Sequence, residues 1–388
     1  MNAEFDFDRL TVRRNTYSDK WDVGDRPEDL IPLWVADMDF EAAPCIVDAL
    51  RRRVEHGVFG YVRVPERFYE AIIGWFGRRH GWTIEHDWIQ YTIGTIPAMS
   101  AIIKALTKPG DKVLAITPVY TCFFSSIRNN GCTLVESPLV NDGGTYTLDF
   151  DDLRRKTADP GVKMLLLCNP HNPVGRVWTA DELRQVAEIC AANGVLIVSD
   201  EIHCELAFDG HRYVPFGSLS PEIMDNAIVC VSPSKSFNIA GLQIAAIVCN
   251  DPERRRLIDR AININEVCEV NLMGVEALIA AYTEGEPWIL ALCDYVYGNY
   301  RLLADTFARH LPQLTVTPLE GTYLAWIDIR PTGMKSDELT RKLYDSTHVM
   351  LSSGTLYGAA GEGFARVNLA TQRSRLAEGL RRMVDFLR

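Results

Sequence analysis

The sequence lacks the long apolar runs of a membrane protein. No segment of its 388 residues approaches the roughly 18 consecutive apolar residues that a transmembrane helix needs. Residues 1–8 contain Glu4, Asp6 and Asp8 but neither a basic stretch nor an apolar core, so a secretory signal is not expected. These absences predict a cytoplasmic protein that does not bind membranes.

Motifs for metal binding are also missing. The ten cysteines form no Cys-x-x-Cys pair, and none of the eight histidines belongs to a His-Glu-x-x-His motif. Cys168, Cys190, Cys230 and Cys249 lie inside apolar runs, where a thiol behaves as a small hydrophobic side chain. We therefore expect reduced cysteines that pack in the core, and no metal site.

The chain has no excess of positive charge. Lys and Arg number 40 against 51 Asp and Glu, which gives a formal net charge of −11. Nucleic acid is therefore not an expected partner, because binding to its phosphate backbone is mainly electrostatic. The composition, 47% hydrophobic and 23% charged, is that of a globular protein, and the length suits two or three domains.

Short apolar runs alternate with amphipathic segments between about residues 90 and 250, which is typical of an α/β protein. The expected strands are Val113 to Ile116, Met164 to Cys168, Val195 to Val198, Ile228 to Val231 and Ile244 to Cys249. Because these runs are apolar on both faces, they predict a parallel or mixed sheet covered by helices. Ligands of such sheets bind at the carboxyl ends of the strands.

One helix of this region has clear end signals. Thr179-Ala-Asp-Glu182 is a capping box that predicts a helix start, and Gly194 predicts its end. A second unit is expected further along, with no flexible tether before it. Its expected elements are a long helix from about Trp288, strands at Thr315 to Thr317, Tyr323 to Ile329 and Ala365 to Leu369, a helix from about Asp337, and a closing helix through Leu376 and Leu387.

Three loops that follow strands carry residues of chemical interest. Lys235 stands between Ser234 and Ser236 directly after a strand, which suits a Schiff-base lysine whose neighbouring hydroxyls hold a phosphate. The alternative is an ordinary surface lysine in a serine-rich turn. Asp200 ends another strand, where a carboxylate can pair with the pyridine nitrogen of pyridoxal phosphate (PLP), although a capping or salt-bridged Asp is the alternative.

Two further polar residues belong to the same loops. His203 suits a hydrogen bond near the phenolic oxygen of the cofactor, or else is a loop histidine with local partners. Asn172 lies in the segment Asn-Pro-His-Asn-Pro, a rigid loop that can fix its amide as a hydrogen-bond donor or can simply form a turn.

These segments, in this order and spacing, resemble the fold-type I PLP-dependent enzymes of the aspartate aminotransferase superfamily. Several strings resemble the cystathionine β-lyase or C–S lyase subgroup: Pro32 to Phe40, Phe59-Gly-Tyr61, Pro118-Val-Tyr120, His171 to Trp178 and Glu320 to Trp326. The resemblance implies a large domain with a mixed, mostly parallel seven-stranded sheet between helices, and a smaller α+β domain. It places the large PLP-binding domain at residues 46–284, and the N-terminal arm with the small domain at residues 1–45 and 285–388.

The resemblance also implies roles for single residues. Lys235 would bond to PLP and move the Cα proton, and Tyr61 would reach the phosphate of a neighbouring subunit in a homodimer with its active sites at the interface. The other implied roles are Asp200 at the pyridinium, Asn172 and His203 near the phenolic oxygen, Tyr120 stacked on the ring, Gly94, Thr95, Ile96, Ser232 and Ser234 at the phosphate, and Arg366 with Asn172 and Ala36 at the substrate.

Two departures from related patterns bear on the activity. Gln243 stands eight residues after the lysine, where aminotransferases of this fold carry a phosphate-binding arginine and the C–S lyase subgroup does not. Thr371-Gln372 replaces the Cys-Pro that the subgroup usually has before Arg373, which predicts a changed contact on the substrate side. The first departure favours a lyase over a transaminase.

The implied reaction is a PLP-dependent β-elimination on L-cystathionine or a related S-substituted L-cysteine, giving a thiol, pyruvate and ammonia. Tyr61 and Tyr120 are both candidates to protonate the leaving sulfur. The alternatives are an aminotransferase with the same cofactor and a PLP-binding regulatory protein. A nicotinamide-dependent dehydrogenase is more remote, because no Gly-x-Gly-x-x-Gly joins a strand to a helix.

Overall fold

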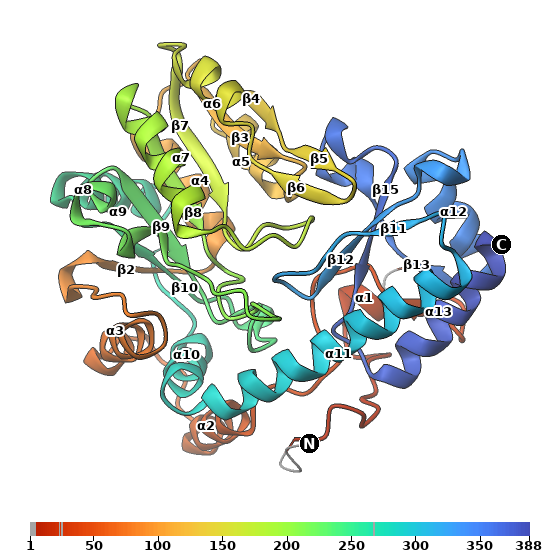
Figure 1. Cartoon of the computed structure of the whole chain (residues 1–388). Helices are drawn as coiled ribbons and strands as arrows, with labels where there is room; N and C mark the ends of the chain where they lie inside the picture. Colours follow the sequence, from red (N-terminus) through yellow and green to blue (C-terminus); the bar gives the residue numbers. More distant parts are fainter. Residues whose placement is uncertain (1–4, 23, 25, 267) are drawn as a thin grey trace.

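A seven-stranded sheet forms the centre of the computed structural model, which describes residues 5–22, 24, 26–266 and 268–388 (Figure 1). β10 runs antiparallel to its neighbours β2 and β9, and the other four strand pairs are parallel, so the sheet is mixed and mostly parallel, as expected. In spatial order the strands are β2 (Ile89–Thr92), β10 (Ala245–Val248), β9 (Ala227–Val231), β8 (Leu196–Asp200), β7 (Val162–Cys168), β3 (Lys112–Thr117) and β4 (Thr133–Pro138).

Alternate residues of the central strands pack on opposite faces of the sheet. Val113 and Leu166 belong to one buried cluster, whereas their neighbours Leu114 and Leu165 belong to the other. Both faces of the sheet are therefore buried, which explains why these strands are continuous apolar runs. Helices from the part of the chain after the N-terminal segment surround this sheet. They are α2 (Pro44–His56), α3 (Glu66–His80), α4 (Thr95–Leu106), α5 (Thr121–Asn129), α6 (Phe150–Thr157), α7 (Ala180–Ala192), α8 (Pro221–Met224), α9 (Pro252–Asn263) and α10 (Leu272–Glu284).

A smaller antiparallel sheet lies beside the first one. Helix α11 (Glu286–His310) runs without interruption from beneath the larger sheet toward the smaller one (Figure 1). The small sheet has the order β11 (Thr315–Val316), β12 (Leu324–Asp328), β15 (Phe364–Asn368) and β14 (Ser352–Ser353), and it is accompanied by α12 (Ser336–Thr347) and α13 (Arg373–Leu387).

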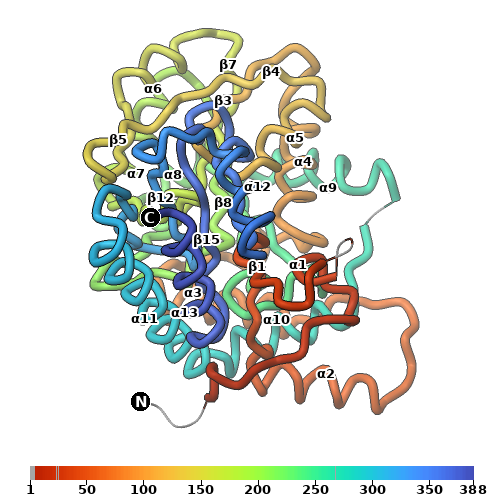
Figure 2. The backbone as a smooth tube through the Cα atoms, turned by 90° about the vertical axis from the view of Figure 1, so that its right-hand side faces the viewer, coloured from red at the N-terminus to blue at the C-terminus, as the bar shows by residue number. Residues whose placement is uncertain are grey.

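The N-terminal segment lies against the last part of the chain. Figure 2 shows the red segment around α1 (Asp19–Asp22) and β1 (Ile31–Pro32) beside the blue C-terminal elements. β1 pairs in parallel with β13 (Val349–Met350). The amide of Gln372 donates to the carbonyls of Arg9 and Asp39, at 3.0 Å and 2.7 Å. The N-terminal segment is thus hydrogen-bonded to the C-terminal part of the chain.

The remaining regular elements are short. A hairpin consists of β5 (Val140–Asp142) and β6 (Thr145–Thr147). The 3₁₀ helices are His86–Trp88, Phe216–Ser218, Ala240–Leu242, Arg330–Thr332, Gly354–Tyr357 and Ala359–Gly361. No helix in the described part of the chain is long and apolar enough to cross a membrane.

The sequence expectations for single elements are largely confirmed. Each expected strand and helix is present with ends shifted by at most a few residues, and all ten cysteines are free thiols. Strands β2 and β4 were not among the expected strands. They lie at the two edges of the sheet, where partly exposed residues interrupt the apolar pattern.

The capping box at the start of α7 gives a test of local stability. The hydroxyl of Thr179 accepts from the Glu182 amide at 3.2 Å, and the Glu182 carboxylate accepts from the Thr179 amide at 2.8 Å. We expect Thr179→Ala to lower the free energy of unfolding by about 1 kcal/mol, measured by urea denaturation, because the first turn loses its cap. Gln185→Ala, an exposed change on the same helix, is the control, and equal losses in both variants would contradict the assignment.

Candidate active site

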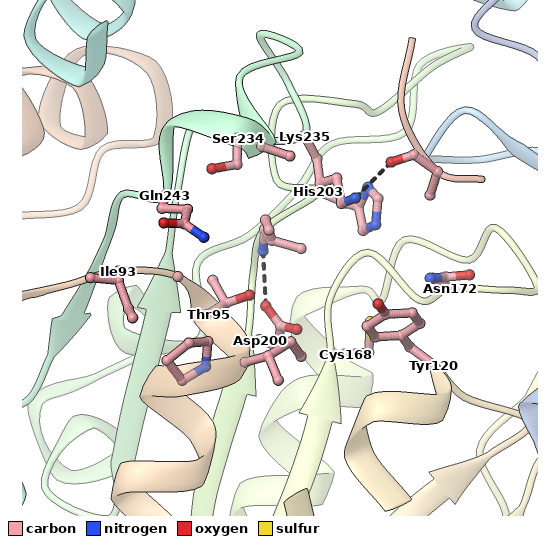
Figure 3. Close-up of a pocket in the computed structure, with 16 residues that line it drawn as sticks. Ile93, Thr95, Tyr120, Cys168, Asn172, Asp200, His203, Ser234, Lys235 and Gln243 are labelled. Carbon is pink, nitrogen blue, oxygen red and sulfur yellow. Dashed lines mark hydrogen bonds between the residues drawn. The ribbon is translucent and has the colours of Figure 1, made fainter. Parts of the chain in front are cut away.

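A cavity of about 180 Å³ opens at the carboxyl ends of β7, β8 and β9, next to the first turn of α4 (Figure 3). Ten of the residues to which the resemblance gives a role at the cofactor or substrate line it: Ala36, Gly94, Thr95, Ile96, Tyr120, Asn172, Asp200, His203, Ser234 and Lys235. Residues up to 199 positions apart therefore meet at one edge of the sheet. Its other lining residues are Ile93, Pro97, Cys168, Ile202, Ala240 and Gln243.

The amine of Lys235 points into this cavity from the loop that follows β9. It donates to the carbonyl oxygen of Ala36 at 2.6 Å, as the dashed line in Figure 3 shows. Surrounding protein atoms lower the pKa of this amine to about 8, and the positive charge of Arg366 adds to the effect. A useful fraction of the amine is therefore neutral near pH 8, and a neutral amine is the form that acts as a nucleophile or base.

Asp200 is the last residue of β8 and lies at the floor of the cavity. Its strand is hydrogen-bonded on both sides, to β7 and to β9, so its position is fixed by the middle of the sheet. One carboxylate oxygen accepts from the Ile202 amide at 3.3 Å (Figure 3). Burial raises the pKa of Asp200 to about 7, against the lowering effects of that amide and of Lys235. Such a carboxyl is strongly stabilised by any positive group placed opposite it.

Arg366 belongs to β15 of the smaller sheet and does not itself line the cavity, but it contacts the lining residue Asn172. Its Nη1 donates to the Asn172 Oδ1 at 3.1 Å, and its Nη2 donates to the Trp34 carbonyl at 2.7 Å. The guanidinium also lies over the ring of Tyr357, 4.9 Å from its centre. Its buried Nε has no hydrogen-bond partner among the described residues. In Figure 3 the Asn172 amide nitrogen is turned toward Tyr120, because the Asn172 oxygen is taken by the arginine.

His203 and Tyr120 form two further walls. Burial, together with the charges of Lys235 and Arg366, lowers the pKa of His203 to about 3, so its ring is neutral. The buried Nδ1 of His203 lacks a partner among the described residues. Tyr120 stands at the start of α5, and burial raises the pKa of its phenol well above the usual value. The phenol stays protonated and presents its ring to the cavity (Figure 3).

The corner of the cavity at the start of α4, called the anion-binding corner below, is suited to an anion. The first amides of a helix have no partners within the helix, and here Gly94, Thr95 and Ile96 present them at the cavity. Ser234 and Gln243 border the same corner (Figure 3). Ser232 does not line the cavity: its hydroxyl donates to the Ile244 carbonyl at 2.7 Å and lies 2.7 Å from the Ser234 hydroxyl. Ser232 thus hydrogen-bonds to Ser234 on the side away from the cavity.

Tyr61 lies outside this cavity. Its side chain is 96% exposed, and it borders a separate shallow hollow with Phe59 and the segment 269–273. The expectation that it serves a neighbouring subunit remains a prediction for this chain. Thr371 and Gln372 do not line the cavity either; both are buried against the N-terminal segment, where Gln372 binds the Arg9 and Asp39 carbonyls.

Sequence reasoning gave no role to Tyr323, whose hydroxyl donates to the Ala36 carbonyl at 2.9 Å. The residue stands in the Glu-Gly-Thr-Tyr string, but its direction depends on a turn that the pattern does not reveal. The described residues contain no group of three or more His, Cys, Asp and Glu side chains that could hold a metal ion.

The raised pKa of Asp200 predicts a pH dependence of stability in the ligand-free protein. Above about pH 4 the unfolded chain releases this proton, whereas the folded chain keeps it until about pH 7. The contribution of Asp200 to stability is therefore present at low pH and is lost as the pH rises through 7. Asp200→Asn cannot ionise, so its stability relative to the original protein should increase by a few kcal/mol between about pH 4 and about pH 8.

Urea denaturation of both proteins across this pH range measures the effect. The matched control is Asp181→Asn, because that carboxylate is 88% exposed and should leave the pH dependence unchanged. If the stability of Asp200→Asn and of the original protein changed with pH in the same way, the raised pKa of the buried Asp200 carboxyl would be contradicted.

Comparisons with known proteins agree with this geometry. The family model described as aminotransferase class I and II matches residues 28–383. Cystathionine beta-lyase PatB of Bacillus subtilis (strain 168) is 39% identical over 380 residues, which cover 97% of this chain and 98% of that protein.

Two solved structures are similar along the whole chain. The PLP-bound putative aminotransferase from Clostridium difficile 630 has a TM-score of 0.96 and 40% identity, covering 99% of this chain and 100% of that one. The PLP-bound C-S lyase from Staphylococcus hominis has a TM-score of 0.92 and 31% identity, with 99% of each chain covered. The chain therefore belongs to the class I and II aminotransferase family of fold-type I PLP-dependent enzymes, in its cystathionine β-lyase or C–S lyase subgroup.

Proposed function

We propose that this protein is a PLP-dependent C–S β-lyase. Its substrate is L-cystathionine or a related S-substituted L-cysteine, and its products are a thiol, pyruvate and ammonia. The observation that carries the proposal is the single cavity in which the Lys235 amine, the Asp200 carboxyl and the anion-binding start of α4 come together. The names of PatB and of the Staphylococcus hominis lyase support the same reaction.

The residues around the cavity fit PLP. Lys235 supplies the amine for its aldehyde, and the start of α4 with Ser234 suits its phosphate. Asp200 suits the ring nitrogen, and the unpartnered buried Nδ1 of His203 marks a polar position that a ligand can satisfy. Tyr120 suits the ring face and Asn172 the phenolic oxygen. When bound, PLP withdraws the electrons left at the substrate Cα, so that a bond at Cβ can break.

Each polar residue then has one task at a stated atom. The neutral amine of Lys235 removes the proton from the substrate Cα, which its pKa of about 8 allows near neutral pH. Asp200 stays ionised opposite a positive ring nitrogen, because an opposite charge offsets the burial that raises its pKa. His203 has a pKa near 3 and so remains a neutral hydrogen-bonding group.

Arg366 binds the α-carboxylate of the substrate. Its unpartnered Nε and the adjacent Nη atoms form a fork that matches a carboxylate, and Asn172 holds one side of the guanidinium in place. Ala36 forms the opposite wall. The sulfur leaves as a thiolate, and Tyr120 or the Tyr61 of a second subunit protonates it.

Gln243 favours the lyase over an aminotransferase. It borders the anion-binding corner at the position where aminotransferases of this fold carry an arginine. The aminotransferase and regulatory alternatives have less support, since PatB, at 39% identity, is named a cystathionine beta-lyase.

We also propose the assembly of the protein. Residues 46–284 form the PLP-binding domain, and residues 1–45 and 285–388 form the arm and the small domain. Two chains associate so that Tyr61 reaches the phosphate of the other active site, which the exposed apolar side chains beside it, Val58 at 61% and Phe59 at 59%, support. The proposed location is the cytoplasm.

The reaction is tested with the PLP-loaded protein and L-cystathionine, and separately with an S-alkyl cysteine. Free thiol and pyruvate are followed together, and a keto acid is added in a parallel reaction. Equal release of thiol and pyruvate without the keto acid is the expected result. Amino transfer to the keto acid without thiol release would overturn the proposal.

Lys235→Ala should abolish both turnover and the visible absorbance of bound PLP, because no other amine lines the cavity as described. Absorbance spectra and the thiol assay measure the two losses. Lys163→Ala removes an exposed lysine of β7 and is the control. A Lys235→Ala protein with ordinary elimination would refute the assignment.

Arg366→Lys should raise KM at least about tenfold with a smaller change in kcat, since a point charge cannot replace the fork that holds the carboxylate in both ground and transition states. Steady-state kinetics with L-cystathionine measure this split. Arg256→Lys, a change in an exposed ion pair with Glu253, serves as the control. An unchanged KM in Arg366→Lys would show that Arg366 does not bind the α-carboxylate of the substrate.

A further inference from the structure

The carbonyl oxygen of Ala36 accepts two hydrogen bonds inside the site. One comes from the Lys235 amine at 2.6 Å and the other from the Tyr323 hydroxyl at 2.9 Å. A carbonyl oxygen has two lone pairs, so both are in use. The lysine that handles the substrate proton and a tyrosine without an assigned role thus share one acceptor.

The phenol of Tyr323 is placed as a permanent donor. Its side chain is fully buried, and burial raises the pKa of its phenol far above the usual value, so the hydroxyl keeps its proton near neutral pH. Its ring meets the ring of His203 edge to face, with centres 5.9 Å apart. The ring contact therefore fixes the position of the Tyr323 hydroxyl, and the raised pKa keeps it protonated, so it acts as a hydrogen-bond donor.

The backbone before Tyr323 is specially arranged. Thr322 has a φ of 67°, which is rare for a residue with a branched side chain. A Cβ on Gly321 would lie 2.7 Å from the Leu206 carbonyl oxygen, so glycine is needed there. Strained backbone persists where surrounding contacts enforce it, and here it turns Tyr323 toward Ala36.

The segment around Ala36 is equally fixed. The Asn368 amide donates to the carbonyls of Val35 and Asp37, at 2.5 Å and 2.6 Å. The Trp34 carbonyl accepts from Arg366. The neighbouring carbonyls of Trp34, Val35 and Asp37 are therefore held by the smaller sheet, whereas the Ala36 carbonyl accepts from Lys235 and Tyr323.

We propose that Tyr323 is a positioning residue for Lys235. By holding the Ala36 carbonyl, the Tyr323 hydroxyl sets the direction in which the Lys235 amine donates its N–H. The lone pair of a neutral amine bonded in this way is directed away from Ala36 and is free to take a proton. This inference rests on the proposed function, because it presumes that Lys235 is the reacting amine.

The shared acceptor also affects the acidity of Lys235. The charged and titratable groups that act on the amine are Arg366, which lowers its pKa, and Asp37, Asp200 and Cys122, which raise it. A carbonyl oxygen that already accepts from a phenol stabilises an ammonium less well, because its electron density is shared. Removing the phenol strengthens the Ala36 oxygen as an acceptor and so favours the protonated amine.

The experiment measures the initial rate at which PLP attaches to the cofactor-free protein as a function of pH, from the rise in visible absorbance, because only the neutral amine attacks the aldehyde. We expect a midpoint near pH 8 for the original protein. We expect Tyr323→Phe to raise that midpoint by about half a pH unit, the size of one modest hydrogen bond. In the thiol assay, Tyr323→Phe should lower kcat about tenfold with little change in KM, as misplacement of a base does.

The control is Tyr300→Phe, which also removes a phenol donor from a backbone carbonyl, that of Thr317, but outside the site. It should leave the midpoint and kcat unchanged. Tyr323→Phe should fold, because Ala36 keeps Lys235 as a donor; thermal unfolding checks this.

A second variant covers the case in which Tyr323→Phe does not fold. Asn368→Ala loosens the backbone beside Ala36 and should move the midpoint below that of the original protein, because the ammonium loses a well-placed acceptor. Folded Tyr323→Phe with an unchanged midpoint, or an unchanged midpoint in Asn368→Ala, overturns the positioning role. Failure of the original protein to attach PLP would instead overturn the proposed function.

Discussion

The hydrogen bond between the Lys235 amine and the Ala36 carbonyl is the contact on which the site depends. A carboxylate in that place would favour the protonated amine, because an opposite charge stabilises an ammonium ion. A neutral carbonyl instead lets the surrounding protein favour the uncharged form, and the pKa of Lys235 falls to about 8. Burial, opposed only weakly by the charges of Asp37 and Asp200, is thus what lowers the pKa of this lysine.

The same constraint explains the rest of the cavity. Asp200 is enclosed and forms no salt bridge with any described residue, so burial raises its pKa to about 7 and a positive partner would stabilise its charged form. Among the described residues, neither the buried Nε of Arg366 nor the buried Nδ1 of His203 has a hydrogen-bond partner. Buried polar groups normally have partners, so these groups indicate where a ligand completes the hydrogen bonding. Leaving buried polar groups without partners costs free energy, and the two sheets keep these groups in place despite that cost.

Much of this arrangement was predictable from the sequence, since local signals were strong. Asp200 and Lys235 directly follow apolar runs, and the carboxyl ends of parallel strands meet at one edge. Contacts between distant segments were not predictable in this way. The bond of Arg366 to Asn172 joins two sheets, and the direction of Tyr323 depends on the positive φ at Thr322, which no periodicity reveals. The edge strands were missed because exposed residues weaken their apolar pattern.

The residue that bonds to PLP is the central claim, and it can be identified directly. The PLP-loaded protein is treated with borohydride, digested, and searched by mass spectrometry for the lysine that carries the reduced cofactor. We expect one modified lysine, Lys235, in the peptide that follows β9. A cofactor on a surface lysine such as Lys163, with Lys235 unmodified, would contradict the account.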